Sequence, residues 1–77
     1  MFSLPAISGK HLIKVLERAG FTVVRTNGSH HRLKHADGRV TTLAVHGNDD
    51  LPKGTIRKII REDLQISMEE FDKLLKH

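Results

Sequence analysis

The sequence predicts a single α+β domain in which a three-stranded antiparallel sheet is covered on one face by helices. The 77 residues suffice for one small domain with a thin core, because such a chain buries only about 60% of its unfolded surface. Two tight-turn signals, Asn27-Gly28 and Asp37-Gly38, separate three short strand-like segments. Apolar residues at helical spacing lie before and after them, and a small sheet needs helices to hide its apolar side. We therefore expect one domain over residues 1–77 with the order α-β-β-β-α-α.

The first helix is expected to run from Ser8, a suitable N-cap residue, to Gly20, which favours the left-handed conformation where helices end. Four apolar residues between them recur at helical spacing: Leu12, Val15, Leu16 and Ala19. Three basic residues recur at every fourth position and should form one exposed stripe: Lys10, Lys14 and Arg18. This helix should therefore present an apolar side to the sheet and a basic side to solvent.

The three strands are expected at residues 21–25, 30–35 and 40–45. The first is rich in β-branched and aromatic side chains. Because the connections are too short for a crossover, neighbouring strands must be antiparallel. The segment is therefore predicted to be a meander in which the second strand is central.

Two helices are expected after the sheet. Pro52 fits the first turn of the earlier one, where the missing N–H of proline has no partner to lose. The apolar stripe of that helix is Ile56, Ile59 and Ile60. The later helix begins at Ser67, which forms a capping box with Glu70. Its apolar residues are Phe71, Leu74 and Leu75.

Composition and charge narrow the classes of function. The absence of cysteine excludes a disulfide scaffold, a thiolate zinc site and a cysteine nucleophile. No apolar run approaches the roughly 20 residues that cross a bilayer, and residues 1–7 lack the basic leader of a secretory signal, so a cytoplasmic protein is expected. The net charge of +4 is uneven: residues 1–61 carry +7 and residues 62–77 carry −3. A basic body of this kind suits a polyanionic partner such as nucleic acid.

The second strand carries the candidate site. Because side chains alternate across a strand, His30, Arg32 and Lys34 share one face. Leu33 is the only apolar residue of this strand and should point toward the helices, which leaves His30 on the open face beside two cations. A neutral imidazole there can accept the proton of a ribose 2′-hydroxyl, while the cations hold phosphate groups.

The other histidines and the turn before His30 are less informative. Gly28 lets backbone N–H groups approach a phosphate, although a hairpin needs glycine in any case. His31 and His35 share a face but lie about 13 Å apart, too far for one ion, so no metal or other cofactor is expected. Judged by these residues alone, His30 is also compatible with an ordinary surface histidine.

Several segments taken together resemble the HicA toxin family. The resemblance extends over nearly the whole chain and is carried above all by Gly28-Ser29-His30-His31 and by Leu51-Pro52-Lys53-Gly54-Thr55. It implies a small mRNA interferase of a bacterial toxin–antitoxin pair, with a fold similar to a double-stranded-RNA-binding domain. Members of the family cleave RNA without a metal ion and are neutralised by a HicB antitoxin.

The resemblance also implies roles for individual residues. His30 is the expected catalytic residue, and His31 is the reserve candidate because family members differ in which histidine of the pair they keep. The resemblance makes Gly28 the supporting glycine of the phosphate site. With the turn and the charged positions described above, the residues expected to bind RNA are Gly28, Ser29, Arg32, Lys34 and Lys53. A HicB-like antitoxin with an acidic surface is expected to cover the basic face in a hetero-oligomeric complex.

Three other functions would use the same features. A non-catalytic binder of double-stranded RNA would use the same basic face, with His30 incidental. A small DNA-binding regulator would use the helix that contains Arg57 and Lys58. A structural or adaptor domain is the third, and no residue of the sequence distinguishes it.

Overall fold

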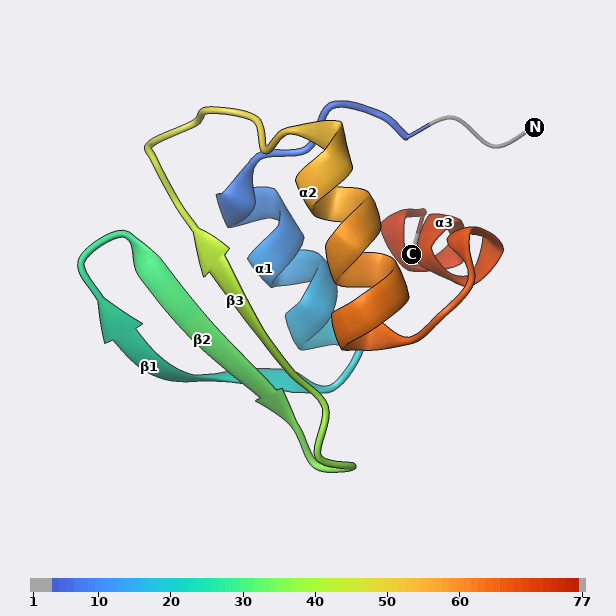
Figure 1. Cartoon of the computed structure of the whole chain (residues 1–77), viewed down its shortest axis with the longest axis horizontal. Helices are drawn as coiled ribbons and strands as arrows, with labels where there is room; N and C mark the ends of the chain where they lie inside the picture. The colour runs from blue at the N-terminus through green and yellow to red at the C-terminus, as the bar shows by residue number, and fades with distance from the viewer. Residues whose placement is uncertain (1–3, 77) are drawn as a thin grey trace.

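The computed structural model describes residues 4–76 and has the expected order of elements. The chain forms α1 (Gly9–Arg18), β1 (Phe21–Asn27), β2 (His30–His35) and β3 (Val40–Ala44), followed by α2 (Lys53–Lys58), η1 (Ile59–Leu64) and α3 (Met68–Leu75). The helices lie on one side of the sheet and leave its other side open (Figure 1). The α+β class predicted from the sequence is therefore confirmed.

The start of α1 lies close to the end of β3. The Ser8 hydroxyl accepts a hydrogen bond from the His11 backbone N–H at 3.1 Å, as expected of an N-cap. A Cβ atom at Gly9 would lie 2.6 Å from the carbonyl oxygen of Ala44, so only glycine allows this approach. At the other end, Gly20 has a φ of +101°, which ends the helix and turns the chain into β1.

The sheet has the order β1-β2-β3, and both strand pairs are antiparallel. β2 is central, so its side chains are positioned by hydrogen-bonded neighbours on both sides. The register between β1 and β2 shifts between Val23 and Arg25, which marks a β-bulge at Val24. The sequence pattern does not predict this bulge, and it has a direct effect on the candidate site.

One hydrophobic core lies between the sheet and the helices. Its buried side chains are Leu4, Ile7, Leu12, Val15, Leu16, Phe21, Leu33, Leu43, Ile56, Ile59, Ile60, Leu64 and Phe71. Val45, the last residue expected in the third strand, is only half-buried and lies just beyond β3. The amide of Val45 donates to the carbonyl of Ser29 at 2.8 Å and so continues the pairing of the sheet.

The helix that follows Pro52 changes its winding halfway. Residues Lys53–Lys58 are α-helical, but Ile59–Leu64 form a π-helix that ends at Gln65 in the left-handed conformation, with a φ of 57°. The wider turn brings Asp63 to the sheet, where its carboxylate accepts a hydrogen bond from the buried Thr41 hydroxyl at 2.8 Å. The apolar stripe is as expected, whereas the π-helical winding is not part of the sequence prediction.

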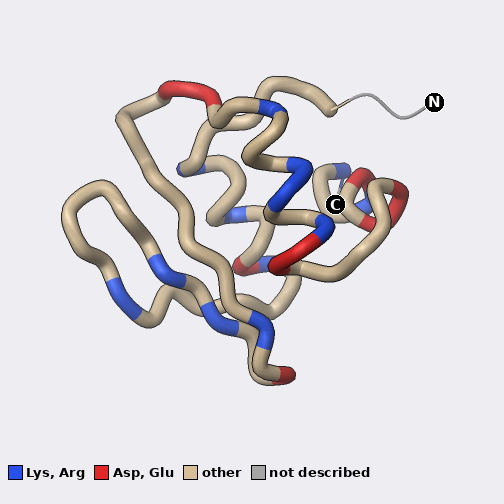
Figure 2. Tube along the Cα trace, viewed as in Figure 1, with Lys and Arg blue, Asp and Glu red and all other residues tan. Residues whose placement is uncertain are grey.

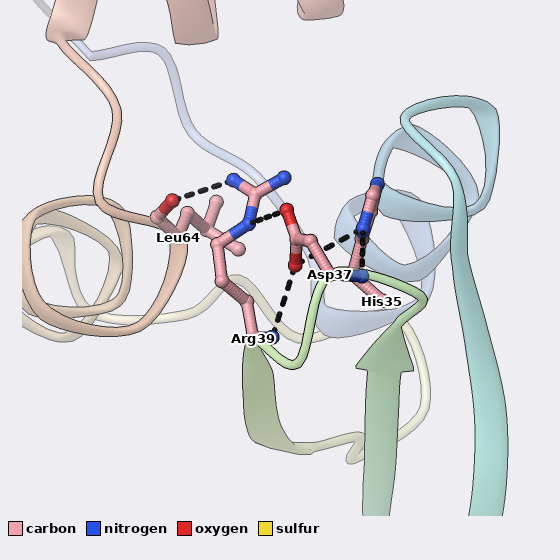
Figure 3. Close-up of polar contacts among 4 residues, drawn as sticks. All are labelled: His35, Asp37, Arg39 and Leu64. Carbon is pink, nitrogen blue, oxygen red and sulfur yellow. Dashed lines mark hydrogen bonds and ion pairs between the residues drawn. The ribbon is translucent and has the colours of Figure 1, made fainter.

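The turn between β2 and β3 is tied to the end of η1 by Arg39 (Figure 3). Its guanidinium donates to the Leu64 carbonyl at 2.6 Å and pairs through Nε with the Asp37 carboxylate at 2.8 Å. The bond from the Arg39 backbone N–H is the main reason why the pKa of Asp37 is lowered. The Asp37 amide in turn donates to Nδ1 of His35 at 3.1 Å, so His35 belongs to this turn. These groups hold the far end of the hairpin against the helices.

Over residues 4–76, no helix combines the length and the apolar character required to cross a membrane.

Candidate functional site

The open face of the sheet carries the three polar residues that strand alternation assigned to it. His30, Arg32 and Lys34 are all exposed, whereas Leu33 between them is 0% exposed and belongs to the core. His31 and His35 are half-buried on the helical side. The division of β2 into an open face and a covered face is therefore as expected.

His30 lies in a shallow hollow of about 260 Å³ on this open face. The hollow is lined by Arg25, Asn27, His30, Arg32 and Thr42. The strand register explains the grouping, because Asn27 and Ala44 flank His30, while Arg25 and Thr42 flank Arg32. An imidazole and two guanidinium groups thus line one concave surface, and none of its lining residues carries a carboxylate.

Sequence reasoning missed two residues of the hollow, Arg25 and Asn27. Regular alternation from the buried Phe21 would place both on the helical side of β1. The bulge at Val24 shifts the alternation by one residue and moves both to the open face. The Val24 side chain at the bulge is itself 54% exposed. The only signal of the bulge in the sequence was Arg25, a charged residue at a position that regular alternation assigns to the core side.

The reserve candidate His31 lies on the other side of the sheet. Its Nδ1 is 3.1 Å from the Ser29 carbonyl oxygen, to which a protonated Nδ1 donates. Its ring faces a separate hollow of about 510 Å³ that includes Lys10, Lys14 and Glu17 of α1. The two adjacent histidines therefore meet different surroundings, and only His30 lies with Arg32.

The remaining residues expected to bind RNA are spread around this hollow. Lys34 lies two residues beyond Arg32 on the same face, outside the hollow. Gly28 is exposed with a φ of +62°, which the turn between β1 and β2 requires. Ser29 follows it and is half-buried, with its carbonyl bonded to Val45. Lys53 is exposed at the start of α2, in the helical layer and not on the open face.

Within residues 4–76, the cations of the open face have no acidic partners. Figure 2 shows basic residues along the strands and acidic residues mainly near the loop before α2 and toward the C-terminus. Among residues 4–76, the salt bridges join other groups: His35 and Arg39 with Asp37, Arg61 with Glu62, and Lys76 with Asp72. The guanidinium groups of Arg25 and Arg32 therefore stand uncompensated and are available to an anion.

Metal ligands do not cluster in the part of the chain that the structure describes. In that part, no group of three or more histidine, aspartate or glutamate side chains is arranged to hold a metal ion. The chemistry that this arrangement offers is proton transfer by imidazole together with phosphate binding by guanidinium groups.

Comparison with known proteins gives one family. The family model described as the HicA toxin of bacterial toxin–antitoxin systems matches residues 9–65, from the start of α1 to the end of η1. The match includes every residue of the hollow and leaves α3 outside. A search of curated proteins gave no match.

Proposed function

Because the chain belongs to the HicA toxin family of bacterial toxin–antitoxin systems, we propose that it is an endoribonuclease that cleaves mRNA with His30 as its proton-transfer group. One observation above all supports this proposal: an exposed imidazole shares a hollow with two guanidinium groups that have no acidic partner in the described part of the chain. Cleavage of RNA through its own 2′-hydroxyl needs these two kinds of group, a base for the hydroxyl and cations for the phosphate.

The proposed reaction begins when the neutral imidazole of His30 accepts the proton of a ribose 2′-hydroxyl. The 2′-oxygen then bonds to the adjacent phosphorus while the bond between phosphorus and the 5′-oxygen breaks. The leaving 5′-oxygen takes up a proton, from the imidazolium or from water. The products are a 2′,3′-cyclic phosphate and a 5′-hydroxyl. The reaction requires neither a metal ion nor another cofactor.

The cations of the open face hold the RNA backbone during this reaction. Arg32 lies beside His30 and faces the non-bridging oxygens, where negative charge accumulates in the transition state. Lys34 holds a neighbouring phosphate further along β2. Gly28 and Ser29 form the turn beside which the RNA strand enters the hollow. Lys53, at the start of α2, contacts the RNA only where the RNA extends beyond the sheet.

A toxin of this family works with an antitoxin, and a HicB-like protein is the proposed partner. An acidic antitoxin surface placed over β2 would neutralise the uncompensated cations and close the hollow to RNA. The toxin and antitoxin would then form a hetero-oligomeric complex in the cytoplasm.

The test is cleavage of a purified RNA by the purified protein in the presence of a chelator. We expect fragments that end in a 2′,3′-cyclic phosphate, and no cleavage at a position where a single 2′-deoxynucleotide replaces the ribonucleotide. Binding is measured in parallel with the same RNA. Binding without cleavage under all conditions would contradict the proposal. It would favour the alternative function, a non-catalytic RNA-binding domain that uses the same basic face.

A further inference from the structure

We propose that Arg25 is a phosphate-binding residue of the active site, and that Arg25 and Arg32 together hold the phosphodiester that is cleaved. The β-bulge at Val24 is the feature that brings Arg25 there. This inference rests on the proposed ribonuclease function and adds Arg25 to its site. Regular strand alternation would place Arg25 on the helical side of the sheet.

The register of β1 places Arg25 on the open face. Val23 pairs with Leu33 and Arg25 pairs with Arg32, so two residues of β1 span a single step of β2. Without the extra residue, Arg25 would point at the core, where a charge without a partner is strongly unfavourable. With it, Arg25 joins the open face and lines the same hollow as His30. Bulges commonly re-aim side chains next to active sites in this way.

Arg25 and Arg32 are a cross-strand pair of like charge. Directly opposed residues of antiparallel strands have Cβ atoms about 4.5–5.5 Å apart, and side chains of like charge in such a pair are destabilising. Arg25 and Arg32 are opposed in this way, and no salt bridge among residues 4–76 includes either of them. The arrangement is therefore unfavourable for the protein alone. An anion bound between the two guanidinium groups removes the repulsion.

A phosphate group is the anion that fits this pair of guanidinium groups. Each guanidinium presents parallel N–H donors that match two oxygens of a phosphate. His30 lines the same hollow, so a phosphodiester held by both arginines has its ribose beside the imidazole. The charge that builds on the non-bridging oxygens during cleavage then develops between the two guanidinium groups, which stabilises the transition state more than the bound substrate.

Lys34 provides a matched control for this proposal. It lies on the same open face and carries the same charge, but it is outside the hollow. The variants Arg25→Gln and Lys34→Gln therefore remove one exposed positive charge each. Only the first removes a charge from the proposed phosphate site.

The experiment measures cleavage at saturating RNA in chelator, together with affinity for a 2′-O-methyl RNA that cannot be cleaved. We expect Arg25→Gln to lower the cleavage rate by about 10- to 100-fold, and Arg25→Lys to recover only part of it. Lys34→Gln should weaken binding without a comparable fall in the rate. Thermal unfolding should show Arg25→Gln to be at least as stable as wild type, because the repulsion with Arg32 is relieved.

A double substitution shows whether the two arginines hold the same phosphate. The affinity loss for 2′-O-methyl RNA in Arg25→Gln/Arg32→Gln should be smaller than the product of the two single losses, whereas Arg25→Gln/Lys34→Gln should be multiplicative. Multiplicative losses in both pairs, or equal rate effects of Arg25→Gln and Lys34→Gln, overturn the inference. Because the affinity and stability measurements need no cleavage, they decide the phosphate site even if the wild-type protein proves inactive as a ribonuclease.

Discussion

The His30→Ala substitution is expected to lower the rate of RNA cleavage by about 10²–10⁴-fold, the usual contribution of a positioned acid or base. The side chain is exposed on β2 and does not belong to the hydrophobic core among residues 4–76, so the fold should remain intact. The residual rate should be that of RNA held by the arginines of the hollow without a base. Single-turnover cleavage in chelator measures the rate, and circular dichroism with thermal unfolding checks the fold.

The adjacent His31→Ala substitution is the control for this result. His31 faces α1 on the covered side of the sheet and is the other histidine of the pair. We expect the His31→Ala variant to retain a cleavage rate within about tenfold of wild type once folding is verified, because His31 lies away from the hollow that contains His30. The opposite ranking, with His31→Ala inactive and His30→Ala active, would transfer the catalytic role to the hollow beside α1.

The Phe71→Ala substitution is expected to have the largest effect on stability. Phe71 is 0% exposed and is the residue by which α3 enters the core. Truncation of a buried phenylalanine costs about 3–5 kcal/mol, and a domain of this size has only about 5–15 kcal/mol in total. Although α3 lies outside the matched part of the chain, it completes the core. Loss of cleavage in this variant would therefore reflect unfolding.

The exposed Lys73 of the same helix provides the comparison for Phe71. Lys73→Ala should change the free energy of unfolding by less than about 0.5 kcal/mol, as is usual for surface positions. Denaturant unfolding of the two variants separates core packing from helix formation. If Phe71→Ala were as stable as Lys73→Ala, α3 would be a peripheral addition to the domain.

Much of the fold follows from local patterns in the sequence. The capping box of Ser67 and Glu70 forms as predicted, with the Ser67 hydroxyl accepting from the Glu70 amide at 3.1 Å. The two glycine turns set the three strands, and period-two alternation in β2 assigned His30 to the open face. These features depend on neighbours in sequence or on a single apolar residue, Leu33, so a linear pattern contains enough information to predict them.

The features that sequence patterns did not predict depend on packing between distant segments. The π-helical turn of η1 brings Asp63 to Thr41, a residue 22 positions earlier, and no i, i+3 or i, i+4 pattern encodes that contact. The bulge at Val24 depends on how β1 meets β2. It decides which residues surround His30, and for that reason the sequence pattern placed His30 and Arg32 on the open face but not Arg25 and Asn27.

The central claim is that the imidazole of His30 meets the RNA backbone on the open face. The most direct measurement is the NMR spectrum of the histidine rings during titration with a 2′-O-methyl RNA, with signals assigned by single His→Gln variants. We predict that the ring signals of His30 shift most, with those of His31 and His35 little changed. Shifts confined to His11 and His31, with His30 unaffected, would place the RNA on α1 and contradict the account.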